Sequence, residues 1–224
     1  MSYILNIDTA VDTGSVCLSY EGKAIGISSN SVQKEHASWL HGAIRDLLDD
    51  KKILPDRLDA IAISMGPGSY TGLRVGMSAA KGLCYALQKP LITINTLKMM
   101  AAAALEAPTP LLCPMIDARR MEVFTAIFDH DLNEAVPYAN MILDEKSFEE
   151  VLTAQAVTFF GNGSTKFSDL AKHPNARFST YEVHAGHMVQ LSYRSFQDGH
   201  FADLAYAEPF YGKDFYLPSH KPTI

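Results

Sequence analysis

The sequence is short of the features that mark several classes of protein. It has only three cysteines among 224 residues, and Cys17, Cys84 and Cys113 lie far apart in apolar surroundings. They form neither a disulfide framework nor a CxxC metal motif, so we expect buried free thiols. No apolar run reaches the roughly 18 residues that a membrane span needs. The segment Met1–Asp8 lacks a basic region and a cleavage site and is typical of a strand, so we expect a cytoplasmic protein.

Positive charge is also scarce. Nineteen lysines and arginines stand against 25 aspartates and glutamates, which gives a net charge of -6. A protein that binds RNA by itself needs a basic face, because phosphate neutralisation dominates nucleic-acid affinity. The basic residues are scattered, and Lys51–Lys52 is only a short pair. We therefore do not expect the chain to bind RNA alone, although a basic patch assembled from distant segments stays open.

Common hydrolase and metal motifs are missing. There is no HExxH motif, and Ser69 follows Gly68 directly, so the GxSxG pattern of serine hydrolases is absent. His184 and His187 share a helical face, but we expect no metal there. What remains is ordinary globular material, with 47% hydrophobic and 20% charged residues. That composition suits one large domain or two small lobes.

The hydrophobic periodicity predicts an α/β chain in which strands precede helices twice. Polar turns and a proline-rich break at Ala107–Pro110 divide the chain into lobes 1–106 and 107–224, which suggests a duplicated unit with a degraded second copy. We predict strands over Tyr3–Asp8, Gly14–Tyr20, Lys23–Ser28, Leu58–Met65, Leu91–Ile94, Leu111–Ile116, Glu122–Asp129 and Val157–Phe160. Helices are expected over His36–Asp50, Thr71–Leu87, Thr96–Leu105 with Thr96 as its cap, Phe148–Leu152, Thr165–Ala171 and His184–Phe196, and Pro209–Ile224 reads as an irregular arm.

The most distinctive motif is Gly66-Pro67-Gly68-Ser69-Tyr70-Thr71-Gly72-Leu73-Arg74-Val75-Gly76, at a strand-to-helix junction. Pro67 and Gly68 suit the central positions of a type II turn, with positive φ at Gly68. Ser69 or Thr71 then caps the helix. The spacing matches neither GxGxxG nor GxxxxGK, and Pro67 removes an N–H that a phosphate nest would use. We therefore favour a structural turn followed by a packing helix over a phosphate site.

This motif resembles the GPGSFTGLRIG signature of the TsaB (YeaZ) family. Further segments resemble the family along most of the chain: Ile7–Ala10, Asp117–Val123 against DARRGEVY, Gly161–Gly163, and Leu204–Tyr211. The sequence departs from the family at Met121, where glycine is usual, at His36-Ala37-Ser38 in place of H-S-E, and in lacking the YLR ending.

The resemblance implies an actin-like (ASKHA, ribonuclease H-like) fold with two lobes of mixed sheets flanked by helices. It implies a non-catalytic subunit that scaffolds and activates a TsaD-like enzyme, helps recruit a TsaE-like ATPase, and meets tRNA only through that complex. TsaD-like enzymes transfer threonylcarbamoyl to adenosine 37 of tRNA. The alternative is a stand-alone ATPase or small-molecule kinase of the same fold. A homodimer of the isolated chain stays open.

TsaD-like enzymes hold a metal with an HxxxH pair, which places two imidazoles on one helical face. His36 and His41 are five residues apart, which separates them by roughly 140° around a helix. We therefore expect one histidine packed, the other exposed, and no metal.

Nucleotide binding is the remaining chemical option. In ASKHA phosphotransferases an aspartate at the end of the first strand helps hold Mg²⁺, and here Asp8, Thr9 and Ser15 match that register. We prefer the reading in which Asp8 and Thr9 satisfy backbone groups of the turn. The second phosphate loop is a poor match, because Asp117–Arg120 has no glycine. We expect no resident cofactor, and weak ADP or ATP binding within a complex stays open.

A partner surface is predicted on two helices. Gly72, Gly76 and Ala80 recur every four residues, which lets another helix approach closely. The alternative is that this row packs inside its own lobe. Because the resemblance implies a four-helix interface, we predict partner contacts at Trp39, Leu40, Gly72, Val75, Gly76, Ala79, Ala80 and Leu83.

Overall fold

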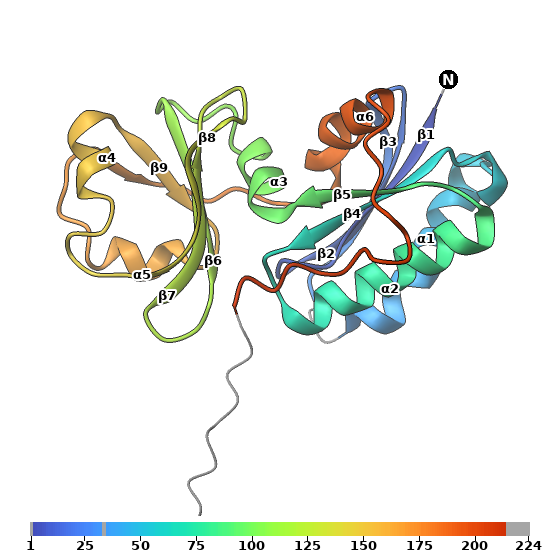
Figure 1. Ribbon diagram of the computed structural model, residues 1–224, viewed down its shortest axis with the longest axis horizontal. Coiled ribbons are helices and arrows are strands. Elements are labelled where there is room, and N and C mark those ends of the chain that lie inside the picture. The colour runs from blue at the N-terminus through green and yellow to red at the C-terminus, as the bar shows by residue number, and fades with distance from the viewer. Residues whose placement is uncertain (1, 33–34, 214–224) are drawn as a thin grey trace, which may run out of the picture.

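The fold was obtained as a computed structural model, and the structure describes residues 2–32 and 35–213. The chain forms two five-stranded sheets, which lie in two lobes side by side (Figure 1). Sheet order is β3-β2-β1-β4-β5 in the first lobe and β10-β9-β6-β7-β8 in the second. The strands of the first sheet are β1 (Tyr3–Asp8), β2 (Gly14–Tyr20), β3 (Lys23–Asn30), β4 (Ala60–Gly66) and β5 (Leu91–Asn95).

The predicted antiparallel meander is confirmed, since β1 pairs with β2 and β2 with β3 in antiparallel register. Strand β4 lies between β1 and β5 and is parallel to both, and it is buried on both faces, which fits its continuous apolar sequence. Helices α1 (His36–Lys51) and α2 (Tyr70–Leu87) cover one face of this sheet, and they lie next to each other (Figure 1). A short 3-10 turn, η2 (Pro55–Arg57), leads from α1 into β4.

The other face of the first sheet is covered by a segment that follows the second sheet in the sequence. The 3-10 turn η3 (Ala185–Met188) and helix α6 (Val189–Gln197) pack there. Met188 of η3 is buried in one cluster with Ile4 and Ile92 of the sheet. Buried Asn6 fixes the position of α6, because its amide donates to Ser19 at 3.1 Å and its oxygen accepts from Ser192 at 2.6 Å. The predicted boundary at residue 106 remains a prediction, but α6 from the second half of the chain packs on the first sheet.

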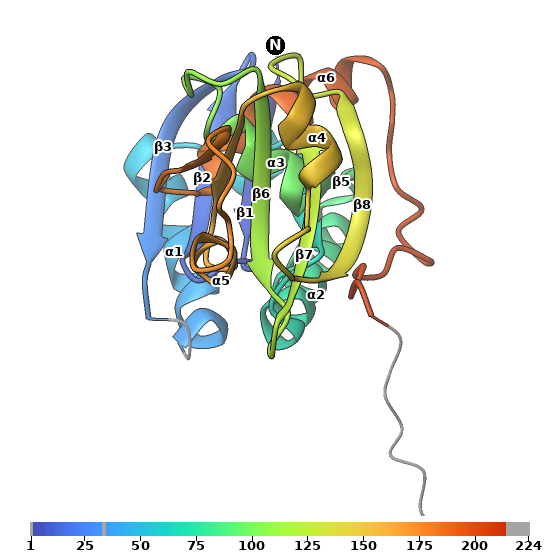
Figure 2. The ribbon, with the colours of Figure 1, turned by 90° about the vertical axis from the view of Figure 1, so that its left-hand side faces the viewer.

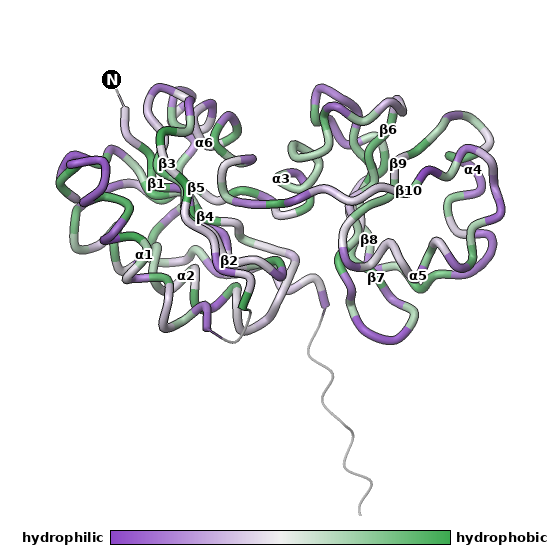
Figure 3. The backbone as a smooth tube through the Cα atoms, turned by 180° about the vertical axis from the view of Figure 1, so that it is seen from behind, coloured by the Kyte–Doolittle hydropathy of each residue, from purple (hydrophilic) through white to green (hydrophobic). Residues whose placement is uncertain are grey.

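The second lobe contains strands β6 (Leu111–Asp117), β7 (Glu122–Phe128), β8 (Glu134–Ile142), β9 (Val157–Phe160) and β10 (Ala176–Phe178). Helices α4 (Glu149–Ala154) and α5 (Ser164–Ser168) cover one face, in front of the sheet in Figure 2. Helix α3 (Thr96–Ala102) contacts β4 and β5 as well as β6 and β7, so it lies between the lobes. Hydrophobic residues, green in Figure 3, run along the strands of both sheets and along the helices that pack on them.

Several local predictions need correction. Strands β8 and β10 were not predicted, and α3 ends at Ala102 rather than Leu105. The cap of α3 is Asn95, whose side chain accepts from Lys98 N, while the Thr96 hydroxyl accepts from Gly66 N at 3.0 Å. A cap must precede the first helical residue to reach the free amides, and Thr96 is already helical. The irregular arm is confirmed as far as Lys213, and the rest of it lies outside the described residues.

The structure also bears on the thiols and on membrane association. All three cysteines are buried and free, as predicted. Within the described residues, no helix is both long enough and apolar enough to cross a bilayer.

Candidate functional site: the cleft between the lobes

A cleft of about 910 Å³ opens between the two lobes. Its first-lobe wall is the turn after β1 (Ala10–Thr13) and the start of α2 (Gly68–Thr71). Its second-lobe wall includes the β6–β7 turn (Asp117–Arg119) and Asn162, and Tyr211 and Lys213 close one side. Clefts of this size between lobes are the usual places for ligands in a protein.

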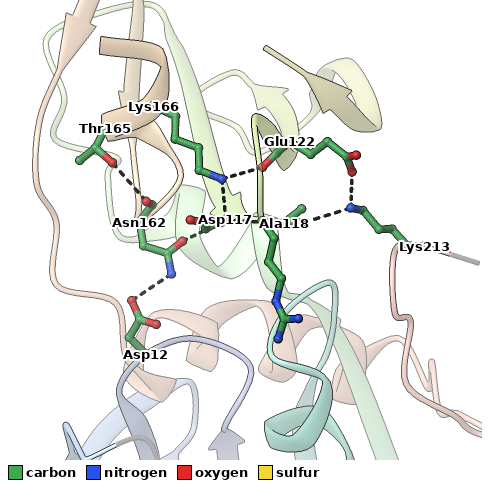
Figure 4. Close-up of polar contacts among 9 residues, drawn as sticks. Asp12, Asp117, Ala118, Glu122, Asn162, Thr165, Lys166 and Lys213 are labelled. Atoms are coloured by element: carbon green, nitrogen blue, oxygen red, sulfur yellow. Dashed lines mark hydrogen bonds and ion pairs between the residues drawn. The ribbon is translucent and has the colours of Figure 1, made fainter. Parts of the chain in front are cut away.

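Polar side chains cross the cleft at one rim (Figure 4). The Asn162 amide donates to Asp12 Oδ2 of the first lobe at 3.0 Å, and its oxygen accepts from Asp117 N at 2.8 Å. Lys166 Nζ donates to Asp117 Oδ1 at 2.6 Å. Burial alone would raise the pKa of Asp117, but the Lys166 ion pair and the Arg119 amide outweigh it and hold that pKa below its usual range. Asp117 is therefore a charged anchor for the β6–β7 turn.

The glycine-rich motif is a packing junction. Gly66 has a φ of 120°, and a Cβ there would collide with the carbonyl of Phe210. The peptide bond between Gly66 and Pro67 is cis, and Gly68 does not have positive φ, so the predicted type II turn is wrong. Gly68 instead lies against the carbonyl of Ala10, and Gly72 against that of Thr9. Glycine occurs here because neighbouring backbone comes too close for a side chain.

Three amides of this junction, those of Ser69, Gly72 and Leu73, donate to acceptors within the chain. Ser69 N donates to Ala10 O at 2.8 Å, and Leu73 N donates to Ser69 O at 2.8 Å. Ser69 is the N-cap of α2, as predicted, because its hydroxyl accepts from Gly72 N at 3.3 Å. These bonds support the interpretation of the motif as a structural junction rather than a phosphate nest.

The three residues of the suggested nucleotide site are all buried, and none lines the cleft. Asp8 Oδ1 accepts from Ser64 at 2.5 Å and from Ala10 N at 3.0 Å. The Thr9 hydroxyl donates to Gly72 O at 2.7 Å, and Ser15 accepts from Ala185 N at 2.8 Å. The prediction that the side chain satisfies a backbone group of the turn is confirmed for Asp8, whereas Thr9 bonds instead to a carbonyl of α2, 63 positions away. A ligand in the cleft would not reach these side chains, and weak nucleotide binding remains a prediction without their support.

Asp8 also has an unusual environment. Burial raises its pKa to about 6 against the opposing effect of the Ser64 and Ala10 hydrogen bonds. Its second carboxylate oxygen has no hydrogen-bond partner within the described part of the chain. A neutral, protonated carboxyl group is favoured in such a place.

The structure corrects the expected role of the small-residue row on α2. Gly72, Gly76 and Ala80 are buried, and a Cβ on Gly76 would collide with Thr9 and Ile63 of the sheet. The row therefore packs inside its own lobe, and so do Leu40 and Ala79. Of the eight residues predicted to contact a partner, three reach the surface as half-buried side chains: Trp39, Val75 and Leu83.

The histidines lie as their spacing predicts. His36 is buried and accepts from Gly14 N at 3.0 Å through Nε2, whereas His41 is exposed. Burial lowers the pKa of His36, which keeps the ring neutral and able to accept. His184 and His187 stack on each other at 3.9 Å between ring centroids. Within the described residues, no three side chains of His, Cys, Asp or Glu are grouped as metal ligands.

Sequence reasoning did not identify the contacts that join the lobes at the cleft. Asn162 was noted only as part of a turn, and Tyr211 and Lys213 only as part of an irregular arm. The sequence feature that could have pointed to Asn162 is its position between two glycines, in the turn that follows the predicted strand Val157–Phe160. No pattern in the sequence pairs Lys213 with residues about ninety positions earlier, such as Glu122.

Two sheets with flanking helices and a cleft between them define a protein of the actin-like, ribonuclease H-like (ASKHA) class. A family profile described as "TsaD: tRNA N6-adenosine threonylcarbamoyltransferase" matches residues 16–209. The chain is 30% identical over 221 residues to the Escherichia coli tRNA threonylcarbamoyladenosine biosynthesis protein TsaB, and the match covers 93% of each chain. The chain belongs to the TsaB (YeaZ) family.

Two further comparisons agree. TsaB of Bacillus subtilis is 34% identical over 143 residues, and the matched stretch spans 62% of each chain. The structure of YeaZ from Pseudomonas aeruginosa superposes with a TM-score of 0.83 at 26% identity, and the match covers 94% of this chain and 100% of that one.

Proposed function

We infer that the chain takes part in forming threonylcarbamoyladenosine in tRNA, as a non-catalytic subunit that binds and activates a TsaD-like transferase. Relatives named for this biosynthesis support the pathway, and the transferase profile supports a shared fold with that enzyme. The same role includes helping to recruit a TsaE-like ATPase and contact with tRNA only through the complex, in the cytoplasm.

The non-catalytic role is supported by how the candidate chemical groups are used. His36 is a buried acceptor for a backbone amide, and Asp8 is buried behind the cleft. Both have a structural task that leaves them out of reach of a substrate in the cleft. This use of the residues favours the scaffold over a stand-alone ATPase or kinase.

The location of the partner surface is inferred mainly from two glycines that lie inside helices. Gly42 on α1 and Gly82 on α2 have no atom within 4 Å of the place where a Cβ would stand. Glycine in a helix interior costs about 1 kcal/mol relative to alanine, and nothing within this chain requires it at either position. A partner helix that approaches the backbone closely would explain both. Trp39, Val75 and Leu83 would add half-buried apolar contacts on the same two helices.

The test is capture of the TsaD-like subunit of the same organism by the purified chain. Gly82→Arg should keep the fold, because the site is open and arginine favours a helix. We expect it to weaken capture at least about tenfold, which corresponds to about 1.4 kcal/mol. Thr153→Arg on exposed α4 is the matched control and should capture the partner like the parent chain. Equal capture by both variants would exclude this surface, and no capture by the parent chain would refute the proposed function.

A further inference from the structure

The segment that follows α6 runs across both lobes. Ala202 bridges to Leu91 at the edge of the first sheet, and Leu204 and Ala207 pack against the first-lobe core. Lys81 of α2 donates to the carbonyls of Ala205 and Ala207 at 3.3 Å and 2.9 Å. We call Pro209–Lys213, which continues this path toward the second lobe, the strap. Figure 1 shows this part of the chain crossing below the gap between the lobes.

The first two contacts of the strap are with the first lobe. Phe210 N donates to Met65 O at 2.8 Å, next to the place where Gly66 leaves room for the Phe210 carbonyl. Arg74 of α2 then donates from Nε to the Tyr211 hydroxyl at 3.0 Å. The Arg74 guanidinium also lies 4.2 Å from the centre of the Tyr70 ring, and the Tyr70 and Tyr211 rings are 4.9 Å apart. The strap is thus tied to the first turns of α2.

The next two residues contact the second lobe. The Tyr138 hydroxyl of β8 donates to Gly212 O at 2.7 Å, and the Tyr138 ring meets Phe210 edge-on at 4.9 Å. Lys213 Nζ donates to Ala118 O at 3.0 Å and forms an ion pair with Glu122, so it holds both ends of the β6–β7 turn (Figure 4). Successive residues of the strap therefore join α2 on one lobe to β8 and the β6–β7 turn on the other.

The strap is also one wall of the cleft, because Tyr211 and Lys213 line it. The hydrogen bond between Asp12 and Asn162 joins the lobes elsewhere along the same cleft. From this arrangement we propose that the strap is a clamp that sets the opening of the cleft, and that it transmits a displacement of α2 to the β6–β7 turn. A helix on the outside of one lobe is thereby coupled to the cleft wall of the other. The inference does not depend on the proposed function.

The test measures the distance between the lobes with spin labels in the full chain. Cysteines placed at Asp49 on α1 and Glu150 on α4 are exposed, whereas the three native cysteines are buried. Truncation after Glu208 removes the strap but keeps Ala205 and Ala207, whose carbonyls accept from Lys81 of α2. We expect it to lengthen the interlobe distance and broaden its distribution in pulsed EPR. Truncation after Lys213 is the matched control and should give the distribution of the full chain.

Point variants separate the clamp from a general effect of truncation. Arg74→Ala breaks the link on α2, and Tyr138→Phe removes the bond to Gly212 but keeps the ring against Phe210. Each should broaden the distribution partly, and the double variant should approach the truncation. Ser78→Ala, at an exposed position on the same helix, should change nothing. An unchanged distribution in the folded truncation, or in the double variant if the truncation does not fold, would overturn the proposal.

Discussion

The carboxyl group of Asp8 shows how a fold can constrain one side chain. It lies at the end of β1, fully buried, with a pKa raised to about 6 by burial. An unfolded aspartate titrates near 3.9, so between about pH 4 and 6 the folded chain holds a proton that the unfolded chain has released. The free energy of unfolding therefore falls as the pH rises through this window.

Asp8→Asn should remove that dependence, because the amide keeps the oxygen that accepts from Ser64 and Ala10 and carries no charge. We expect the stability of the variant relative to the parent to rise by roughly 2.4 kcal/mol between pH 4 and pH 7.5. Urea unfolding at both pH values measures this difference. The exposed Asp131→Asn should show no such change. If the free energy of unfolding of Asp8→Asn differed from that of the parent by the same amount at both pH values, the folded chain would keep Asp8 charged.

Two glycines on α2 should respond oppositely to the same substitution. A Cβ at Gly76 would collide with Thr9 and Ile63, whereas one at Gly82 meets nothing within 4 Å. Gly76→Ala should therefore destabilise the chain by about 1–3 kcal/mol through overpacking. Gly82→Ala should stabilise it by about 1 kcal/mol through helix propensity. Chemical unfolding of both variants checks the sign of each, and equal effects would contradict the orientation of the helix.

The elements that the sequence predicts best are those with a clear hydrophobic pattern, whether periodic as in a helix or continuous as in a buried strand. Helix α1 and strand β4 lie within two residues of their expected bounds, since apolar spacing and turn residues agree there. Strand β8 was missed because its half-exposed pattern and Pro137 do not read as a strand. It forms because its backbone pairs with β7 in an antiparallel arrangement. Tertiary pairing of this kind overrides local propensity.

The cleft was less predictable than the strands and helices. The motif Gly66–Gly72 was correctly assigned to a strand-to-helix junction, but periodicity cannot say which face of α2 is buried when small residues surround it. The contacts of Asn162, Tyr211 and Lys213 join residues about 90 to 150 positions apart. Such pairs depend on how the two lobes meet, and no local sequence pattern encodes that.

The first lobe as a whole is discontinuous, because η3 and α6 cover one face of a sheet that is built from residues 3–95. A fragment of residues 1–106 should therefore expose an apolar layer that includes Ile4, Ala60 and Ile92. We expect it to bind the dye ANS and to aggregate, as exposed apolar faces do. A fragment of residues 96–182 contains all of the second sheet together with α3, which packs on it, and should bind ANS and aggregate less.

Joining residues 183–207 to the 1–106 fragment through a flexible linker should restore the missing layer and reduce ANS binding. Ser192→Ala within that joined segment leaves the Asn6 oxygen unpaired and should reduce the rescue. Compact, monomeric behaviour of the 1–106 fragment alone in size-exclusion chromatography would contradict this reasoning. It would also support the predicted boundary at residue 106 as the limit of a folding unit.

The return of α6 to the first sheet has a consequence for synthesis on the ribosome. Translation delivers Asn6 186 residues before Ser192, yet the two share a buried hydrogen bond of 2.6 Å. The strands of the first sheet must therefore wait, with one face uncovered, until α6 has been made. The second sheet is complete before that moment, since its last strand ends at Phe178. The lobe made first is thus the lobe finished last, and one apolar face of its sheet stays uncovered while the whole second sheet is being made.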